Sequence, residues 1–141
     1  NIRDTEILGG KRPMGVADKL IREAKKAREK AYAPYSKFRV GAALMTEDGS
    51  VYTGCNVENA SYGATCCAER VAIFKAVSDG KRDFTAIAVM SDSHKFTFPC
   101  GICLQVMVEF KIPTVIVADR SGGTAQYKLN DLLPYAFDKI K

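Results

Sequence analysis

Three of the five cysteines in this sequence lie in two short motifs whose residue types could do chemistry. The motif C-A-E begins at Cys67 and places Glu69 two residues after a thiol, and the motif P-C-G-I-C contains Cys100 and Cys103. Three thiolates suit tetrahedral Zn²⁺, which is closed by four protein ligands in structural sites and keeps a position open for water in catalytic ones. The motifs therefore predict a zinc site, with Glu69 as a carboxylate beside it.

The remaining ligand candidates are few. His94 is the only histidine and lies in a polar stretch, Cys55 falls in a predicted strand, and Cys66 directly precedes Cys67. An odd number of cysteines without a secretory signal argues against a disulfide framework. We assign no role to His94, and Cys55 is interpreted as a small buried residue. These residues alone leave open whether a fourth protein ligand closes the site.

The pattern of apolar residues predicts alternating helices and strands. The order is α-β-β-α-β-α-β-β-α, with elements expected near residues 16–31, 38–46, 51–57, 67–78, 83–91, 102–110, 113–118, 125–129 and 129–137. Such an order indicates an α/β protein, a three-layer α/β/α sandwich with a mixed five-stranded sheet. Both cysteine motifs stand at predicted helix starts, which a β–α crossover can bring to the same edge of the sheet.

Helical spacing leaves open which of two adjacent cysteines belongs with the carboxylate. In a regular helix Cys66 and Glu69 would share a face, as residues i and i+3, whereas Cys67 and Glu69 would lie about 200° apart. Cys67 fits only if its segment is not yet helical.

Length and composition set the wider frame. With 141 residues and a net charge of +5, we expect a flexible N-terminal segment over residues 1–12 and a single domain over 13–141. No apolar run approaches the roughly 18 residues that span a membrane, and no signal segment opens the chain, so a cytoplasmic protein without membrane partners is expected. Because the basic residues gather mainly in one predicted helix, residues 19–31, no nucleic-acid partner is expected.

The two motifs together have the form C-x-E…P-C-x-x-C, a pattern known in zinc-dependent nucleobase deaminases. With FRVGAAL, TGCNVENASY, CAERVAIFKAVSDG, PCGICLQV and LLPYAF, the chain resembles the small homotetrameric cytidine deaminases of the cytidine/deoxycytidylate deaminase family from about Pro13 to Phe137. The resemblance implies an enzyme, a cytidine deaminase, that hydrolyses cytidine and deoxycytidine to uridine and deoxyuridine plus ammonia in pyrimidine salvage.

The resemblance also implies the role of each site residue. One Zn²⁺ per chain would be held by Cys67, Cys100 and Cys103, and Glu69 would carry protons without binding the metal. Five residues would bind the nucleoside: Phe38 against the base, Asn56 and Glu58 at the ribose hydroxyls, and Ala60 and Tyr62 in a loop that reaches a neighbouring subunit's site. Phe38 has a second interpretation, since an aromatic residue in a strand is commonly part of the core.

Charge draws attention to Arg70. Three thiolates and Zn²⁺ sum to −1, so nearby positive charge has to compensate, from helix N-termini and from Arg70 as a hydrogen-bond donor to the thiolates. The family usually carries arginine directly after the second cysteine of P-C-x-x-C, where this chain has Leu104. We expect Leu104→Arg to be tolerated.

Three other functions fit part of the pattern. One is deamination of the antibiotic blasticidin S, but the run from Asn56 to Asn59 favours a ribose-bearing substrate. A polynucleotide deaminase is supported only by the net charge, and 141 residues leave little room for a strand-binding channel. A zinc-stabilised interaction module without activity is disfavoured by the presence of Glu69.

Overall fold

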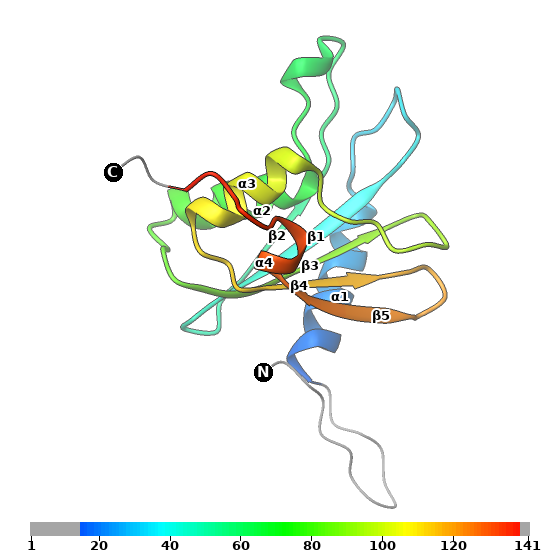
Figure 1. Cartoon of the computed structure of the whole chain (residues 1–141). Coiled ribbons are helices and arrows are strands. Elements are labelled where there is room, and N and C mark those ends of the chain that lie inside the picture. The colour runs from blue at the N-terminus through cyan, green and yellow to red at the C-terminus, as the bar shows by residue number, and fades with distance from the viewer. Residues whose placement is uncertain (1–14, 139–141) are drawn as a thin grey trace, which may run out of the picture.

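A computed structural model describes residues 15–138 and places five strands in one mixed sheet with helices on both faces (Figure 1). The strand order is β2-β1-β3-β4-β5, with β3 and β4 parallel and the other neighbours antiparallel. The predicted α/β fold with a mixed five-stranded sheet is thereby confirmed. The helices and strands are α1 (Val16–Arg28), β1 (Val40–Thr46), β2 (Val51–Cys55), the 3₁₀ turn η1 (Tyr62–Ala64), α2 (Ala68–Ser78), β3 (Phe84–Ser91), α3 (Gly101–Glu109), β4 (Thr114–Ala118), β5 (Thr124–Lys128) and α4 (Leu129–Leu132).

Among residues 15–138, α1 is the one helix on its face of the sheet. Its buried residues Leu20 and Ala24 pack against small side chains of β1 and β3 such as Ala43 and Ala88. The helix approaches β1 so closely that a Cβ atom built on Gly41 would lie 1.9 Å from the Ala24 carbonyl oxygen. Glycine at this position therefore sets the depth at which α1 lies on the sheet.

Helices α2 and α3 cover the opposite face, where the larger part of the core lies. Ile73 of α2 and Met107 of α3 are fully buried against the sheet. A Cβ atom built on Gly54 of β2 would lie 2.5 Å from the Ala68 carbonyl oxygen and 2.5 Å from the Ala72 nitrogen. The first turn of α2 thus rests directly on the β2 backbone, and Gly54 fixes where that helix begins.

Two predicted helices end earlier than expected. Helix α1 stops at Arg28 because the chain turns extended at Tyr32, whose N–H donates to the Asn56 carbonyl at 3.0 Å. The C-terminal helix is one short turn that ends at Leu132 instead of continuing to residue 137. Pro34 and Pro134 stand beyond these ends, and a residue before proline is disfavoured in helical conformation.

The predicted N-terminal segment, residues 1–12, lies outside the described residues. Within residues 15–138 no helix is both long and apolar enough to cross a membrane.

Candidate active site

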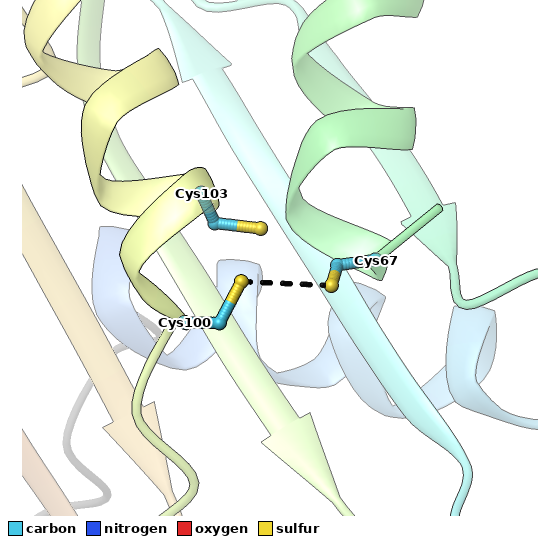
Figure 2. Close-up of side chains that lie close together, drawn as sticks. All are labelled: Cys67, Cys100 and Cys103. Carbon is cyan, nitrogen blue, oxygen red and sulfur yellow. Dashed lines mark hydrogen bonds between the residues drawn. The ribbon is translucent and has the colours of Figure 1, made fainter. Parts of the chain in front are cut away.

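Three thiols converge where α2 and α3 begin (Figure 2). The sulfurs of Cys67, Cys100 and Cys103 lie within 4.8 Å of one another, and the Sγ atoms of Cys67 and Cys100 are 3.8 Å apart. Zinc–thiolate bonds of about 2.3 Å in a tetrahedron place two sulfurs roughly 3.8 Å apart. The donor set and its spacing therefore fit Zn²⁺, with a fourth position left for a non-protein ligand.

The helix starts favour ionised thiols. Cys67 and Cys100 are the N-cap residues of α2 and α3, each with an extended backbone, and Cys103 follows in the first turn of α3. A helix N-terminus carries a partial positive charge of about half a unit, and a thiol placed there ionises more readily. Two such N-termini meet at this group of sulfurs.

The question of the adjacent cysteines is answered by the backbone before α2. Cys66 and Val57 exchange two backbone hydrogen bonds of 3.0 Å in an isolated β-bridge, so the chain is extended as it enters the helix. Successive side chains of an extended chain point in opposite directions. Cys67 consequently joins the other two thiols while Cys66 does not, and Glu69 follows within the first turn of α2.

Glu69 is a buried carboxyl group, with 4% of its surface exposed. Desolvation raises its pKa to about 7, and the neighbouring Cys67 charge acts in the same direction. A carboxyl group with a pKa near neutrality can both accept and release a proton at working pH. Such a group can carry protons in both directions, which is the role that the resemblance implies for Glu69.

Arg70 is in contact with the thiol group. Its Nη2 donates to the Cys67 sulfur at 3.4 Å. Hydrogen bonds from Cys103 and from Arg70 hold the pKa of the Cys67 thiol well below its ordinary value, and Cys67 in turn raises the pKa of Arg70. The Arg70 Nε is buried without a hydrogen-bond partner among the described residues. The guanidinium group therefore contacts the thiols without using all of its N–H donors.

Asn56 and Phe38 lie at the same edge of the sheet. The Asn56 side chain makes two hydrogen bonds to the backbone that leads into β1. Its Oδ1 accepts from the Val40 N–H at 2.9 Å, and its Nδ2 donates to the Phe38 carbonyl at 2.8 Å. Phe38 itself precedes β1 instead of lying in it, and 39% of its surface is exposed. A partly exposed ring held at the strand's entrance is not a core residue, which leaves it available to a ligand.

Glu58 and Tyr62 line a cavity of about 410 Å³ together with Tyr35, Ser36 and Thr65. Glu58 accepts hydrogen bonds from the backbone N–H groups of Tyr35 and Ser36, each at 3.0 Å, and from the Ser36 hydroxyl. These hydrogen bonds lower the pKa of Glu58, so it is an acceptor at neutral pH. The cavity thus has one charged wall and two aromatic ones.

Ala60 and Tyr62 lie on the loop that projects from this end of the molecule between β2 and α2 (Figure 1). Tyr62 opens η1, and its ring meets the Tyr35 ring edge-on at 6.0 Å while 76% of its surface is exposed. Ala60 is also exposed. The ligand-binding role of Ala60 remains a prediction.

Comparison with known proteins gives the family. Residues 14–119 match the model of the cytidine and deoxycytidylate deaminase zinc-binding region. The chain belongs to this family. A cytidine deaminase of Sporosarcina psychrophila is 54% identical over 125 residues, covering 86% of this chain and 91% of that protein. One of Halalkalibacterium halodurans is 52% identical over 120 residues, covering 84% and 91%. The crystal structure of cytidine deaminase from Burkholderia pseudomallei, 54% identical, superposes with a TM-score of 0.82 over 84% of this chain and 97% of that one.

The departure from the family pattern at Leu104 has a structural setting. Leu104 is 9% exposed and belongs to the core cluster that α3 forms with the sheet. An arginine placed there would have to bury its stem in the core and bring its charge out, which adds a desolvation cost. This position argues against the expectation that Leu104→Arg is tolerated.

Sequence reasoning missed Ser36. Its hydroxyl donates to Glu58, which stands 22 residues further along the chain, and accepts the Phe38 N–H at 3.0 Å. Nothing in the local pattern links residues so far apart. The only sequence signal is a hydroxyl two residues before an aromatic side chain that was expected to meet the substrate.

Proposed function

We propose that the protein hydrolytically deaminates cytidine and deoxycytidine to uridine and deoxyuridine, with release of ammonia. The observation that carries this proposal is the group of three thiols, Cys67, Cys100 and Cys103, at two adjoining helix N-termini with the buried carboxyl Glu69 in the first turn of α2. The family match and the relatives named cytidine deaminase support it.

Each residue has a part in this reaction. Cys67, Cys100 and Cys103 would hold Zn²⁺, which when bound supplies a water acidic enough to act as a nucleophile near neutral pH. Glu69 takes one proton of the attacking water and gives it to N3 of the cytosine ring. It then takes the proton of the hydroxyl formed at C4 and gives it to the departing amine, so that uridine and ammonia are released. Burial of Glu69 keeps bulk water away and tunes its affinity for the proton. Arg70 offsets the negative charge of the thiolates.

The nucleoside is read by the segments that flank the thiol group. The exposed ring of Phe38 packs on the base, and the polar groups of Asn56 and Glu58 face the ribose hydroxyls. Ala60 and Tyr62 complete the binding surface from the projecting loop. What supports this assignment is the cavity shared by Glu58 and Tyr62, together with the position of Phe38 at the entrance of β1.

A spectrophotometric assay with cytidine, on protein whose zinc content per chain is known, tests the proposal. We expect turnover by the wild type and a kcat lower by about 10²–10⁴ in Glu69→Gln, since general acid–base catalysis contributes that much. Glu69→Gln should keep its zinc, because Glu69 is not a ligand. If zinc-loaded wild type is as inert as Glu69→Gln, the proposed function is wrong. Blasticidin S and single-stranded DNA are tested separately as alternative substrates. Faster turnover of either one would identify it, and not cytidine, as the substrate.

We further propose that the enzyme acts in the cytoplasm, in pyrimidine salvage, as a homotetramer whose sites are completed by neighbouring subunits. The exposed aromatic side chains at the site's edge support an association surface, with Tyr35 48% and Tyr62 76% exposed. The loop between β2 and α2 projects from the body of the chain (Figure 1), as a segment that contacts a neighbouring subunit would. Light scattering on the purified protein should give the mass of four chains, and a monomeric mass at assay concentration would contradict this part of the proposal.

A further inference from the structure

The hydroxyl of Ser36 connects a charged side chain to the segment that carries Phe38. Glu58 is ionised and has no proton to give, so the Ser36 O–H donates to Glu58 Oε2. With its proton engaged, the Ser36 oxygen offers lone pairs, and one of them accepts the Phe38 N–H at 3.0 Å. The three residues thus form one directional chain of hydrogen bonds, from the Phe38 backbone through Ser36 to the carboxylate.

Glu58 has little hydrogen-bonding capacity left after these contacts. A carboxylate offers about four lone-pair positions. Oε1 accepts two backbone N–H groups, from Tyr35 and Ser36, at 3.0 Å each, and Oε2 accepts the Ser36 hydroxyl. One acceptor position remains on Oε2, in the wall of the 410 Å³ cavity. A ligand group that fills this position has to be a hydrogen-bond donor, as a sugar hydroxyl is.

The other side of Phe38 is held independently. Asn56 bonds the Phe38 carbonyl at 2.8 Å and the Val40 N–H at 2.9 Å, and it is buried, with 8% of its surface exposed. Loss of the Ser36 hydroxyl would therefore loosen the segment at one end only. We therefore expect loss of the Ser36 hydroxyl to weaken ligand binding without disturbing β1 or the core.

We propose that Ser36 is a positioning residue for the nucleoside, because its hydroxyl fixes the free acceptor of Glu58 and the backbone of Phe38 in one arrangement. The inference rests on the proposed function, in which Glu58 meets the ribose and Phe38 the base. Ser36 makes the recognition of the sugar and of the base depend on the same hydrogen-bonded unit.

The test compares Ser36→Ala with Ser36→Thr, which keeps the hydroxyl, and with Ser78→Ala as a matched control. Ser78 is also an exposed serine that donates one hydrogen bond, to the Lys75 carbonyl, at the far end of α2. For Ser36→Ala we expect KM for cytidine to rise about tenfold, the size of one lost hydrogen bond to a charged group, with kcat within about twofold. Ser36→Thr should keep KM near the wild-type value, and Ser78→Ala should have the same KM and kcat as the wild type.

A second substrate separates positioning from a general structural effect. With 2′,3′-dideoxycytidine, which lacks the 2′ and 3′ hydroxyls that Glu58 would bind, the loss of kcat/KM in Ser36→Ala should be smaller than with cytidine, because only the part that acts through Phe38 remains. The double variant Ser36→Ala with Glu58→Gln should lose less towards cytidine than the sum of the two single variants. Equal losses on both substrates, additive losses in the double variant, or an unchanged KM in Ser36→Ala would each overturn the inference. These outcomes are read only against an active wild type, so an inert wild type refutes the proposed function instead.

Discussion

Helices α1 and α2 pack on opposite faces of the same sheet but present opposite ends to the edge where β3 finishes. Helix α1 ends there, and its last residue, Arg28, donates to the Ser91 carbonyl at 2.9 Å. Helix α2 begins there, as does α3, and the residues at these N-termini are thiols. Since a helix N-terminus attracts negative charge and a C-terminus repels it, only the α2/α3 face can gather three thiolates.

Charge is handled differently on the two faces. At the end of α1, Arg28 and Arg39 meet the carboxylates of Glu29 and Asp92 in a network of ion pairs. At the start of α2, Arg70 meets sulfur, and its Nε has no partner among residues 15–138. The α1 network is complete in itself, whereas the α2/α3 group needs a further cation. The same edge of the sheet therefore carries a closed ion-pair network on the α1 face and a group of thiols that fits a metal ion on the α2/α3 face.

The strongest loss of stability is expected from substitution of Gly41 or Gly54, the two glycines on which α1 and α2 pack. A Cβ at Gly54 would push the first turn of α2 off the sheet, and a Cβ at Gly41 would push α1. Both Gly54→Ala and Gly41→Ala should lower the free energy of unfolding by about 3 kcal/mol, as overpacking against backbone does. Only Gly54→Ala should also lower the zinc content per chain, because it moves Cys67. Urea unfolding measures the stability and metal analysis the zinc content. Loss of zinc in Gly41→Ala but not in Gly54→Ala would contradict the claim that α2, and not α1, positions the thiols.

A smaller effect is expected from the two arginines. Arg70→Ala removes the donor to Cys67 and should weaken zinc binding 10–100-fold in competition with a chelator, as loss of a group that hydrogen-bonds a metal ligand does. Arg28→Met keeps a buried apolar stem but loses the hydrogen bond to the Ser91 carbonyl and the ion pairs with Glu29 and Asp92, which should lower the free energy of unfolding by about 2 kcal/mol. Zinc affinity should stay unchanged in Arg28→Met. Equal zinc affinities for wild type and Arg70→Ala would show that helix N-termini alone offset the thiolate charge.

The smallest effect concerns pH and the α1 network. Hydrogen bonds from Arg39 hold the pKa of Asp92 below its ordinary value of 3.8. A carboxyl group with a lowered pKa stabilises the fold above its unfolded pKa, and this contribution is lost as the pH falls through the folded one. Near pH 6 the free energy of unfolding of the wild type should exceed that of Asp92→Asn by about 1 kcal/mol at most, because Asp92 is partly exposed and its ion pair is screened by water. Melting curves should converge below pH 3.8, and a gap that widens there would contradict the assignment.

Much of this arrangement could be predicted because it depends on local pattern. The element order and the place of both motifs at helix starts follow from periodicity and short motifs. The thiol set needed the family resemblance as well, because helical spacing alone pairs Cys66 with Glu69. The position of Phe38 could not be predicted, since it depends on Lys37, whose φ of 58° breaks the extended chain before β1. The burial of Leu104 and the bond between Ser36 and Glu58 depend on contacts made only after folding.

The most direct test of the account is the zinc content of two variants that differ at neighbouring positions. Cys66 is tied into a β-bridge with Val57, and Cys67 caps α2 beside the sulfurs of α3. Metal analysis of purified Cys66→Ala should give about one zinc per chain, as in the wild type, whereas Cys67→Ala should retain almost none. Zinc retained in Cys67→Ala, or lost in Cys66→Ala with the fold intact, would show that the thiol group at the helix starts is not the metal site.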